Sequence, residues 1–247
     1  MNKILLPELS NGRLIRVNKP SIPLKNSIVL IGPDGSGKST LSQTIRDQRP
    51  NLEHYERYLN LPKDQDIALQ KFKELKANAP IINGQHEYCP ETTLHYMVHV
   101  IVTDMTKELN TDPKFVEGLL APKVYACITK YLHQAMKEKK NESVQLYSQL
   151  QEIARHVLGQ MSNIHENVFF LDVPQNELTR RIELRNRQHG QAEYDFFDKQ
   201  IMGKDTDIYF EALGDAFDLL NAKQVYANVP KEKMLQVAEE IIERSGL

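Results

Sequence analysis

Residues 31 to 40, IGPDGSGKST, combine glycines with a lysine and hydroxyl side chains at a spacing that could bind phosphate. Gly32, Gly37, Lys38 and Ser39 fit the pattern G-x-x-x-x-G-K-[ST]. In this pattern backbone N–H groups curl around phosphate oxygens, the lysine reaches the outer phosphates and the hydroxyl binds Mg²⁺. We therefore predict ATP and Mg²⁺ as cofactors. The predicted contacts to the nucleotide come from Gly32, Gly35, Ser36, Gly37, Lys38, Ser39 and Thr40.

Four arginines further along the chain could serve a phosphate group that is being transferred. Arg180, Arg181, Arg185 and Arg187 lie on or just past one predicted helix, beside a turn that contains Gly190. This arrangement suits a mobile flap that closes guanidinium groups on phosphates. We predict catalytic roles for Arg185 and Arg187. For Arg180 and Arg181 we expect the solvated face of the helix.

Asp172 ends the apolar run VFFLDV at residues 168–173. Ligands of parallel sheets gather at the carboxyl ends of the strands, so Asp172 is a candidate Mg²⁺ ligand beside Ser39. A structural cap for the next turn is the alternative role of Asp172. The pattern alone leaves both open.

The interior of the glycine loop resembles the P-loop of the thymidylate kinase family. In that family a carboxylate two residues after the first glycine faces the sugar of the acceptor nucleotide, and Asp34 occupies this position. One branch of the family has an arginine next, where this chain has Gly35, so the resemblance implies that a lid supplies the positive charge. Residues 168–213 also resemble the family's fourth strand, its lid and the long helix after it. Among the predicted catalytic residues are therefore Asp34 and Lys38.

The middle of the chain departs from this family. The family carries Asp-Arg-Tyr or Asp-Arg-His after its third strand, where the carboxylate acts near the metal and the arginine binds phosphate. Counting back from residues 168–173 at the family's spacing places Thr129-Lys130-Tyr131 there, and His86-Glu87-Tyr88 is the rival. The family also grips the acceptor phosphate with an arginine after its second strand, where this chain offers Arg57. The resemblance thus implies Asp34, Arg57 and Lys130 as substrate-binding residues.

The surrounding elements alternate between strands and helices. The segment 27–30 reads as a buried strand before the loop, and 41–49 as a helix that stops before Pro50. Further strands are predicted at 52–59, 122–128, 168–173 and 223–229, and helices at 64–79, 91–109, 143–161 and 231–246. We predict an α/β protein with a three-layer P-loop kinase fold, in which helices cover both faces of a five-stranded parallel sheet.

Composition limits the organisation and the partners. The 247 residues predict an N-terminal arm at 1–26 and one domain at 27–247, with a lid near 180–193. The net charge of −2 does not indicate binding to a nucleic acid polymer. Two cysteines without metal-ligand spacing favour a reducing compartment, and no window reaches 18 apolar residues, so we expect a cytoplasmic protein without a membrane partner. The family resemblance implies a homodimer, for which the apolar segment 92–105 could supply the interface.

The predicted activity follows from the resemblance. It implies an ATP-dependent nucleotide kinase, which moves the γ-phosphoryl group of ATP to a (deoxy)nucleoside monophosphate. Two alternatives stay open: a P-loop protein that binds nucleotide without transfer, and a kinase of a nucleoside or another small hydroxylated molecule. The missing Asp-Arg-Tyr favours binding without transfer, whereas Asp34, Lys38 and the lid arginines favour a kinase.

Overall fold

The computed structural model describes residues 27–55, 114–119, 121–163, 165–189 and 196–247, together with Ala77 and four short strands at 3–5, 16–18, 81–82 and 85–86. Arg57 and the predicted segment 91–109 lie outside the described residues. So does the predicted helix 64–79, apart from Ala77. The prediction of a dimer through residues 92–105 therefore stays a prediction.

One parallel sheet organises the chain. Its strands are β3 (Ser27–Ile31), β4 (Glu53–Tyr55), β7 (Lys114–Glu117), β8 (Val168–Asp172) and β9 (Lys223–Tyr226). They run in the order β4-β7-β3-β8-β9, and every neighbouring pair is parallel. The expected α/β architecture with a parallel sheet is confirmed. The central strand β3 carries the glycine loop at its carboxyl end.

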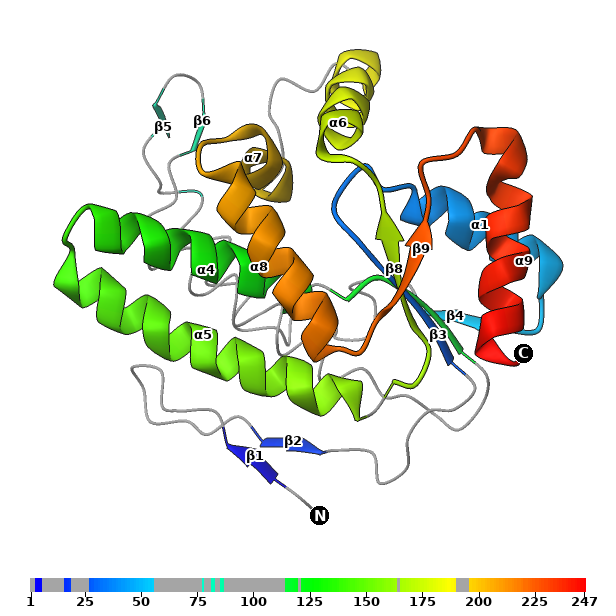
Figure 1. Ribbon diagram of the computed structural model, residues 1–247, viewed down its shortest axis with the longest axis horizontal. Helices are drawn as coiled ribbons and strands as arrows, with labels where there is room; N and C mark the ends of the chain where they lie inside the picture. Colours follow the sequence, from blue (N-terminus) through cyan, green and yellow to red (C-terminus); the bar gives the residue numbers. More distant parts are fainter. Residues whose placement is uncertain are drawn as a thin grey trace.

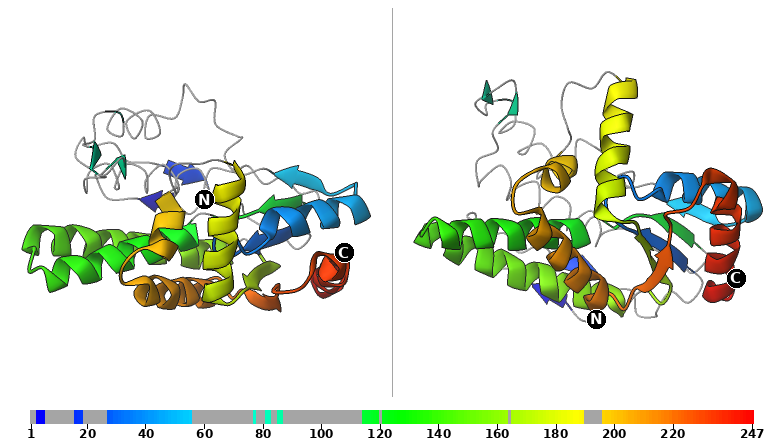
Figure 2. Two further views of the ribbon diagram at one scale, coloured as in Figure 1. Left: turned by 90° about the horizontal axis from the view of Figure 1, so that it is seen from above. Right: turned by 45° about the horizontal axis from the view of Figure 1, so that its top comes forward.

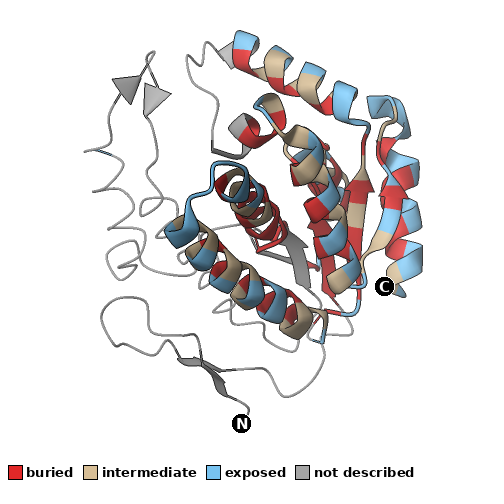
Figure 3. Ribbon diagram, turned by 60° about the vertical axis from the view of Figure 1, so that its left-hand side comes forward, coloured by how far each residue is buried: buried red, intermediate tan, exposed pale blue. Residues whose placement is uncertain are grey.

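Helices cover both faces of this sheet (Figure 1). On one face lie α4 (Ala121–Lys137), α5 (Asn141–Ser162) and α8 (Thr206–Leu219); on the other lie α1 (Lys38–Gln48) and α9 (Met234–Ser245). Side chains of β3 alternate between these faces, because successive residues of a strand point to opposite sides. Val29 belongs to the core beneath α4, α5 and α8, and Ile28 to the core beneath α1 and α9. Figure 3 shows the buried residues on the sheet and on the helix sides that face it.

The structure corrects the predicted strand at 122–128. This apolar segment is the first part of α4, in which residues 121–128 are all buried. A short apolar run can be a buried strand or a buried helix, and periodicity does not separate the two. The third strand of the sheet is β7, and it lies between β3 and β4.

The rival candidate around His86 lies outside this sheet. The strands β5 (Ile81–Ile82) and β6 (Gln85–His86) form an antiparallel pair of their own. They therefore do not supply the third parallel strand, and Glu87 and Tyr88 lie outside the described residues. In the predicted N-terminal arm, β1 (Lys3–Leu5) pairs with β2 (Arg16–Asn18), also antiparallel.

Helix α6 (Gln175–His189) stands on the carboxyl edge of the sheet, beyond the tip of β8 (Figure 2). It begins directly after Pro174, whose carbonyl accepts hydrogen bonds from the backbone N–H groups of Glu177 and Leu178. The short helix α7 (Phe196–Met202) follows and contacts both α6 and α8. All four arginines of the predicted lid therefore lie on α6, and one of them, Arg181, reaches the glycine loop.

The remaining predicted elements agree with the structure. Residues 143–161 lie in α5, and the closing helix predicted at 231–246 is a 3-10 turn, η1 (Lys231–Lys233), followed by α9. Gly246 ends α9 with a φ of 74°, a left-handed conformation that favours glycine. Among the described residues, none of the helices has the length and apolar character that crossing a bilayer requires.

Candidate phosphate-transfer site

The glycine loop wraps around the ammonium group of Lys38. Its Nζ donates hydrogen bonds to the carbonyl oxygens of Gly32 at 3.0 Å and Pro33 at 2.8 Å, and to Ser36 Oγ at 3.4 Å. Gly37 precedes α1 with a φ of 92°, which favours glycine. Strand β3, this loop and the amino end of α1 together define a P-loop, with the positive end of the helix directed at the loop.

A cavity of about 670 Å³ opens over the loop. Its walls come from four parts of the chain: the loop with the first turn of α1, helix α6, the segment after β9, and the start of α9. The lining residues are Asp34, Gly35, Gly37, Lys38, Ser39, Thr40, Arg181, Arg185, Val229, Lys231 and Met234. The structure thus brings most of the predicted nucleotide contacts to one cavity together with two arginines of the lid. Gly32 and Ser36 lie in the loop but outside this lining.

Asp34 forms an ion pair inside the fold. Its Oδ1 lies 2.5 Å from Nζ of Lys123, which belongs to the first turn of α4. The Lys123 side chain is 3% exposed and that of Asp34 is 12% exposed. Lys123 was not among the predicted site residues. In the predicted strand 122–128 it is a single lysine between apolar residues, and nothing in its spacing indicates a contact with the glycine loop.

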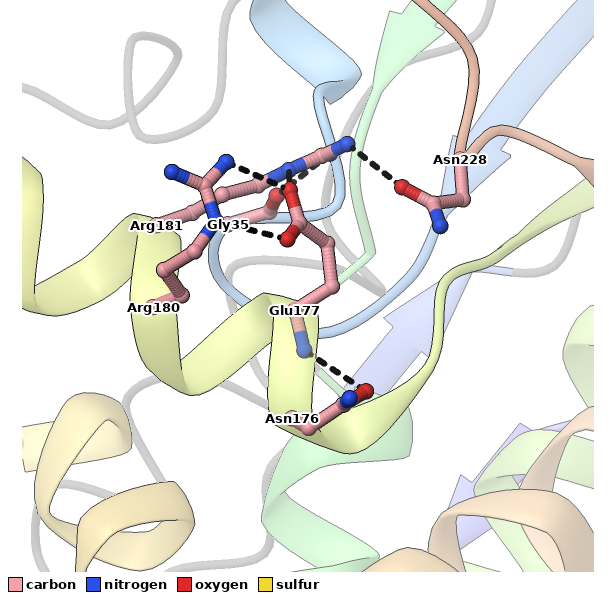
Figure 4. Close-up of polar contacts among 6 residues, drawn as sticks. All are labelled: Gly35, Asn176, Glu177, Arg180, Arg181 and Asn228. Atoms are coloured by element: carbon pink, nitrogen blue, oxygen red, sulfur yellow. Dashed lines mark hydrogen bonds and ion pairs between the residues drawn. The ribbon is translucent and has the colours of Figure 1, made fainter.

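Arg181 connects α6 to two other elements across the cavity (Figure 4). Its Nη1 donates to the carbonyl of Gly35 at 3.2 Å, and its Nη2 donates to Oδ1 of Asn228 at 3.0 Å. Its Nε donates to Oε1 of Glu177 at 2.7 Å. The guanidinium therefore joins the lid helix, the P-loop and the segment after β9. The expectation that Arg181 lies on the solvated face is wrong.

Glu177 is the shared partner of two neighbouring arginines. Arg180 donates to it through Nε at 2.7 Å and through Nη2 at 2.8 Å, in addition to the bond from Arg181. Hydrogen bonds first from Arg180 and then from Arg181 lower the pKa of Glu177 to about 2. Arg180 is 61% exposed and lies outside the cavity lining, as the sequence predicts for a solvated face.

Arg185 and Arg187 have different surroundings, although both were predicted to be catalytic. Arg185 lines the cavity, and it also forms an ion pair with the buried carboxylate of Asp198 on α7. Arg187 is 79% exposed, lies outside the cavity lining and pairs with Glu183 at 3.7 Å. The spacing explains the difference, because Arg181 and Arg185 are four residues apart and share a helix face. The role of Arg187 stays a prediction.

The two predicted metal ligands are also placed differently. Ser39 is exposed in the cavity at the start of α1, and its hydroxyl suits Mg²⁺, which typically takes few protein ligands together with phosphate oxygens. Asp172 lies outside the lining and accepts a hydrogen bond from Gln224 Nε2 at 2.8 Å. Among the described residues, no three His, Cys, Asp or Glu side chains are grouped to hold a metal ion. Of the two, Ser39 fits the ion.

The predicted triplet Thr129-Lys130-Tyr131 lies in the middle of α4 rather than after a strand. Lys130 is buried and donates to the carbonyl of Gln200 at 3.2 Å, and burial lowers its pKa. None of the three residues lines the cavity. The family spacing places this triplet after a strand, whereas here it lies within a helix, and a substrate contact of Lys130 stays a prediction.

The position that follows the true third strand holds other residues. β7 ends at Glu117, which is level with Leu30 of the neighbouring strand β3. The chain therefore has Glu117 as the last residue of its third strand, followed directly by Gly118. Glu117 was not a candidate in the sequence, because β7 has only four residues, begins and ends with a charged residue, and so lacks the apolar run by which a strand is recognised.

No family model matches the chain, and no curated protein matches it. Similar solved structures include a deoxyadenosine kinase from M. mycoides with bound dCTP, at 14% identity and a TM-score of 0.48, covering 88% of this chain and 99% of that one.

Two further solved structures are similar at lower TM-scores. A shikimate kinase from Acinetobacter baumannii in complex with shikimate is 16% identical, with a TM-score of 0.41 over 91% of this chain and 93% of that one. A gluconokinase from Sinorhizobium meliloti is 13% identical, with a TM-score of 0.35, and the match covers 90% of this chain and 94% of that one. The roles of individual residues therefore depend on the geometry of the cavity itself.

Proposed function

We propose that this chain is an ATP-dependent phosphotransferase with a P-loop kinase fold. One observation carries the proposal: a P-loop lysine, a carboxylate within the loop and two arginines of α6 surround the same cavity. Lys38, Asp34, Arg181 and Arg185 are these residues. Phosphoryl transfer requires positioning and charge neutralisation rather than a covalent intermediate, and this set of side chains supplies both.

The donor nucleotide binds at the loop. Its outer phosphates accept hydrogen bonds from backbone N–H groups of residues 35–40 and from Lys38, which moves from the loop carbonyls to the phosphates. Ser39 holds Mg²⁺, an ion that neutralises charge on the β- and γ-phosphates. Arg181 and Arg185 face the cavity from α6, so their guanidinium groups stabilise the charge that develops during transfer.

For the acceptor we propose a (deoxy)nucleoside monophosphate, as in the thymidylate kinase family. Asp34 accepts a hydrogen bond from a hydroxyl group of this acceptor. This role explains why a loop that binds a triphosphate contains a carboxylate. Arg57 remains the proposed ligand of the acceptor phosphate.

A nucleoside or another small hydroxylated molecule is the second candidate acceptor. The observation that favours it is Gly118, which follows the third strand where an arginine would bind the acceptor phosphate. An acceptor without a phosphate does not need that cation. Glu117 at the end of β7 keeps a carboxylate at the position that acts near the metal in the resembling family.

A panel of acceptors separates these candidates. We expect ADP release from MgATP to depend on the presence of one class of acceptor, and to be absent from Lys38→Ala. Deoxynucleoside monophosphates, deoxynucleosides and small hydroxylated acids or sugars form the panel. Nucleotide binding is followed in parallel as the rise in melting temperature with MgATP. Binding without acceptor-dependent ADP release would support the remaining alternative, a nucleotide-binding protein without transfer.

A further inference from the structure

The ion pair between Lys123 and Asp34 joins α4 to the P-loop. Its two partners are 89 residues apart in the chain, and Nζ lies 2.5 Å from Oδ1. Asp34 contributes to the cavity wall, whereas Lys123 does not. The lysine therefore approaches the carboxylate from inside the protein, on the side away from the cavity.

Stability is a weak explanation for this pair. Lys123 lies within residues 121–128 of α4, all of which are buried. Removing an ammonium group from water costs several kcal/mol, and apolar residues in place of a buried ion pair often leave a protein equally stable or more stable. Pro122 and Val124, the neighbours of Lys123 in the chain, are apolar and buried, and an apolar side chain at position 123 would continue this run.

The position of Asp34 creates an electrostatic conflict that Lys123 relieves. Asp34 and Lys38 line the same cavity, so the carboxylate lies in the wall of the region where the outer phosphates of a nucleotide bind. Like charges at short range repel, and the repulsion is strong where water is excluded. A cation behind the carboxylate cancels this repulsion without occupying the cavity. It also fixes the direction in which the carboxylate points.

We propose that Lys123 is a positioning residue of this site: it neutralises and orients Asp34, so that the P-loop can hold a carboxylate for the acceptor beside a bound triphosphate. The claim that Asp34 then serves the acceptor rests on the proposed function. The claim that Lys123 lets the loop bind ATP beside a carboxylate, called the donor part below, needs only the binding of ATP to the loop. Lys123 thus acts on Asp34 from α4, whereas the positive charge for the transfer itself is assigned to Arg181 and Arg185 of α6.

Binding of MgATP tests the donor part by calorimetry at pH 7.5. Lys123→Met removes the ammonium group beside Asp34, and we expect the Kd for MgATP to rise about tenfold. Asp34→Asn alone should bind MgATP as wild type or more tightly. The double variant has neither charge and should return to about the wild-type affinity. A loss of affinity in Lys123→Met that persists in the double variant would overturn the proposal.

Acceptor kinetics test the second part. In Lys123→Met we expect kcat/KM for the acceptor to fall at least tenfold with saturating MgATP, and in Lys123→Arg to recover in part because the charge is kept. Lys137→Met is the matched control: it lies on the same helix, about 21 Å away at 1.5 Å per residue, and removes an exposed ion pair with Asp205. Lys137→Met should leave the Kd for MgATP and kcat/KM for the acceptor unchanged.

A purely structural pair predicts a different set of results. Lys123→Met would then lower the melting temperature but keep the wild-type Kd for MgATP and the wild-type acceptor KM, and this result would refute the proposal. If Lys123→Met does not fold, Lys123→Gln takes its place, because the amide keeps a polar partner for Asp34 without the charge, and the proposal requires the same rise in the Kd for MgATP. If no acceptor is phosphorylated, the proposed function fails, while the binding measurements still test the charge pair.

Discussion

Arg180 and Arg181 are neighbours on α6 and share the carboxylate of Glu177, yet their surroundings differ. Arg181 bridges Gly35 and Asn228 over the P-loop, whereas Arg180 is mostly exposed and donates its hydrogen bonds to Glu177 on its own helix. This pair offers a matched comparison, because each substitution removes one arginine from the same glutamate.

We expect Arg181→Ala to lower kcat by about 10²-fold, as loss of a donor that stabilises charge in the transition state does elsewhere. Arg180→Ala should retain kcat within a few fold, because exposed ion pairs contribute little. Steady-state kinetics with MgATP and the active acceptor measure both. Equal losses in the two variants would mean that the arginines act only through Glu177.

Asp34 separates an enzyme that uses an acceptor from a protein that only binds nucleotide. In Asp34→Asn we expect kcat/KM for the acceptor to fall by one to two orders of magnitude, because a charge-assisted hydrogen bond contributes about 1.5–3 kcal/mol. The Kd for MgATP should stay constant or decrease. Separate titrations of ATP and acceptor measure the two effects, and unchanged acceptor turnover would exclude the role of Asp34.

Sequence patterns predict these residues unequally. The P-loop residues follow from a fixed spacing, so Lys38 and Ser39 could be assigned before the structure. Lys123 could not, because its importance comes from a contact with a residue 89 positions away. Arg181 could have been found from its spacing of four residues to Arg185, which places both on one face of a helix.

At the scale of elements, α6 is held against the P-loop by the contacts of Arg181 and by packing. A Cβ atom at Gly35 would lie 3.4 Å from the carbonyl oxygen of Leu178 and 3.5 Å from Cγ1 of Ile182, both on α6. Gly35 itself has a φ of 81°, which favours glycine. Helix α6 therefore approaches the loop backbone to within van der Waals contact of such a Cβ atom, and the φ of 81° would strain any other residue at position 35.

The shared carboxylate of Glu177 makes this attachment dependent on pH. Its pKa is lowered from an ordinary 4.5 to about 2 in the folded protein, so its contribution to stability is complete above about pH 4.5 and is lost as the pH falls toward 2. We expect wild type to exceed Glu177→Gln in free energy of unfolding at pH 7, and the difference to shrink between pH 4.5 and 2. Urea unfolding at several pH values measures this difference.

Glu183→Gln is the control for that experiment. Glu183 also lies on α6, but its pair with Arg187 spans 3.7 Å and is exposed. Its substitution should change stability little at any pH. A difference between wild type and Glu177→Gln that stays constant down to pH 2 would contradict the account of the shared carboxylate.

The helix α4 shows why one element could not be read from the sequence. It packs against α5 and α8, so its first eight residues lose the polar face by which an amphipathic helix is recognised. The strands β3 and β8 were predictable for the opposite reason: each is a continuous apolar run that ends at a turn signal. Because the start of α4 is buried, its sequence resembles a strand. The third strand was therefore predicted at 122–128 and not at β7.

At the scale of the whole molecule, the order of the strands determines where the site forms. β3 lies between β7 and β8: after β3 the chain passes to β4 and β7 on one side, and it then crosses to β8 and β9 on the other side. Ligands of open parallel sheets bind at the carboxyl ends of strands beside such a reversal. The P-loop follows β3, α4 follows β7 and α6 follows β8, so three consecutive neighbours in the sheet supply Lys38, Lys123 and Arg181.

The most direct test of the central claim follows the γ-phosphoryl group of ATP itself. The protein is mixed with ATP labelled at the γ-phosphorus, Mg²⁺ and the acceptor panel, and the labelled products are separated and identified. We predict that label leaves ATP and appears in one class of phosphorylated acceptor, in equal amount to the ADP formed, and that Lys38→Ala forms neither product. Label that remains in ATP with every acceptor, or that appears only as inorganic phosphate, would contradict the assignment of this fold and site to a small-molecule kinase.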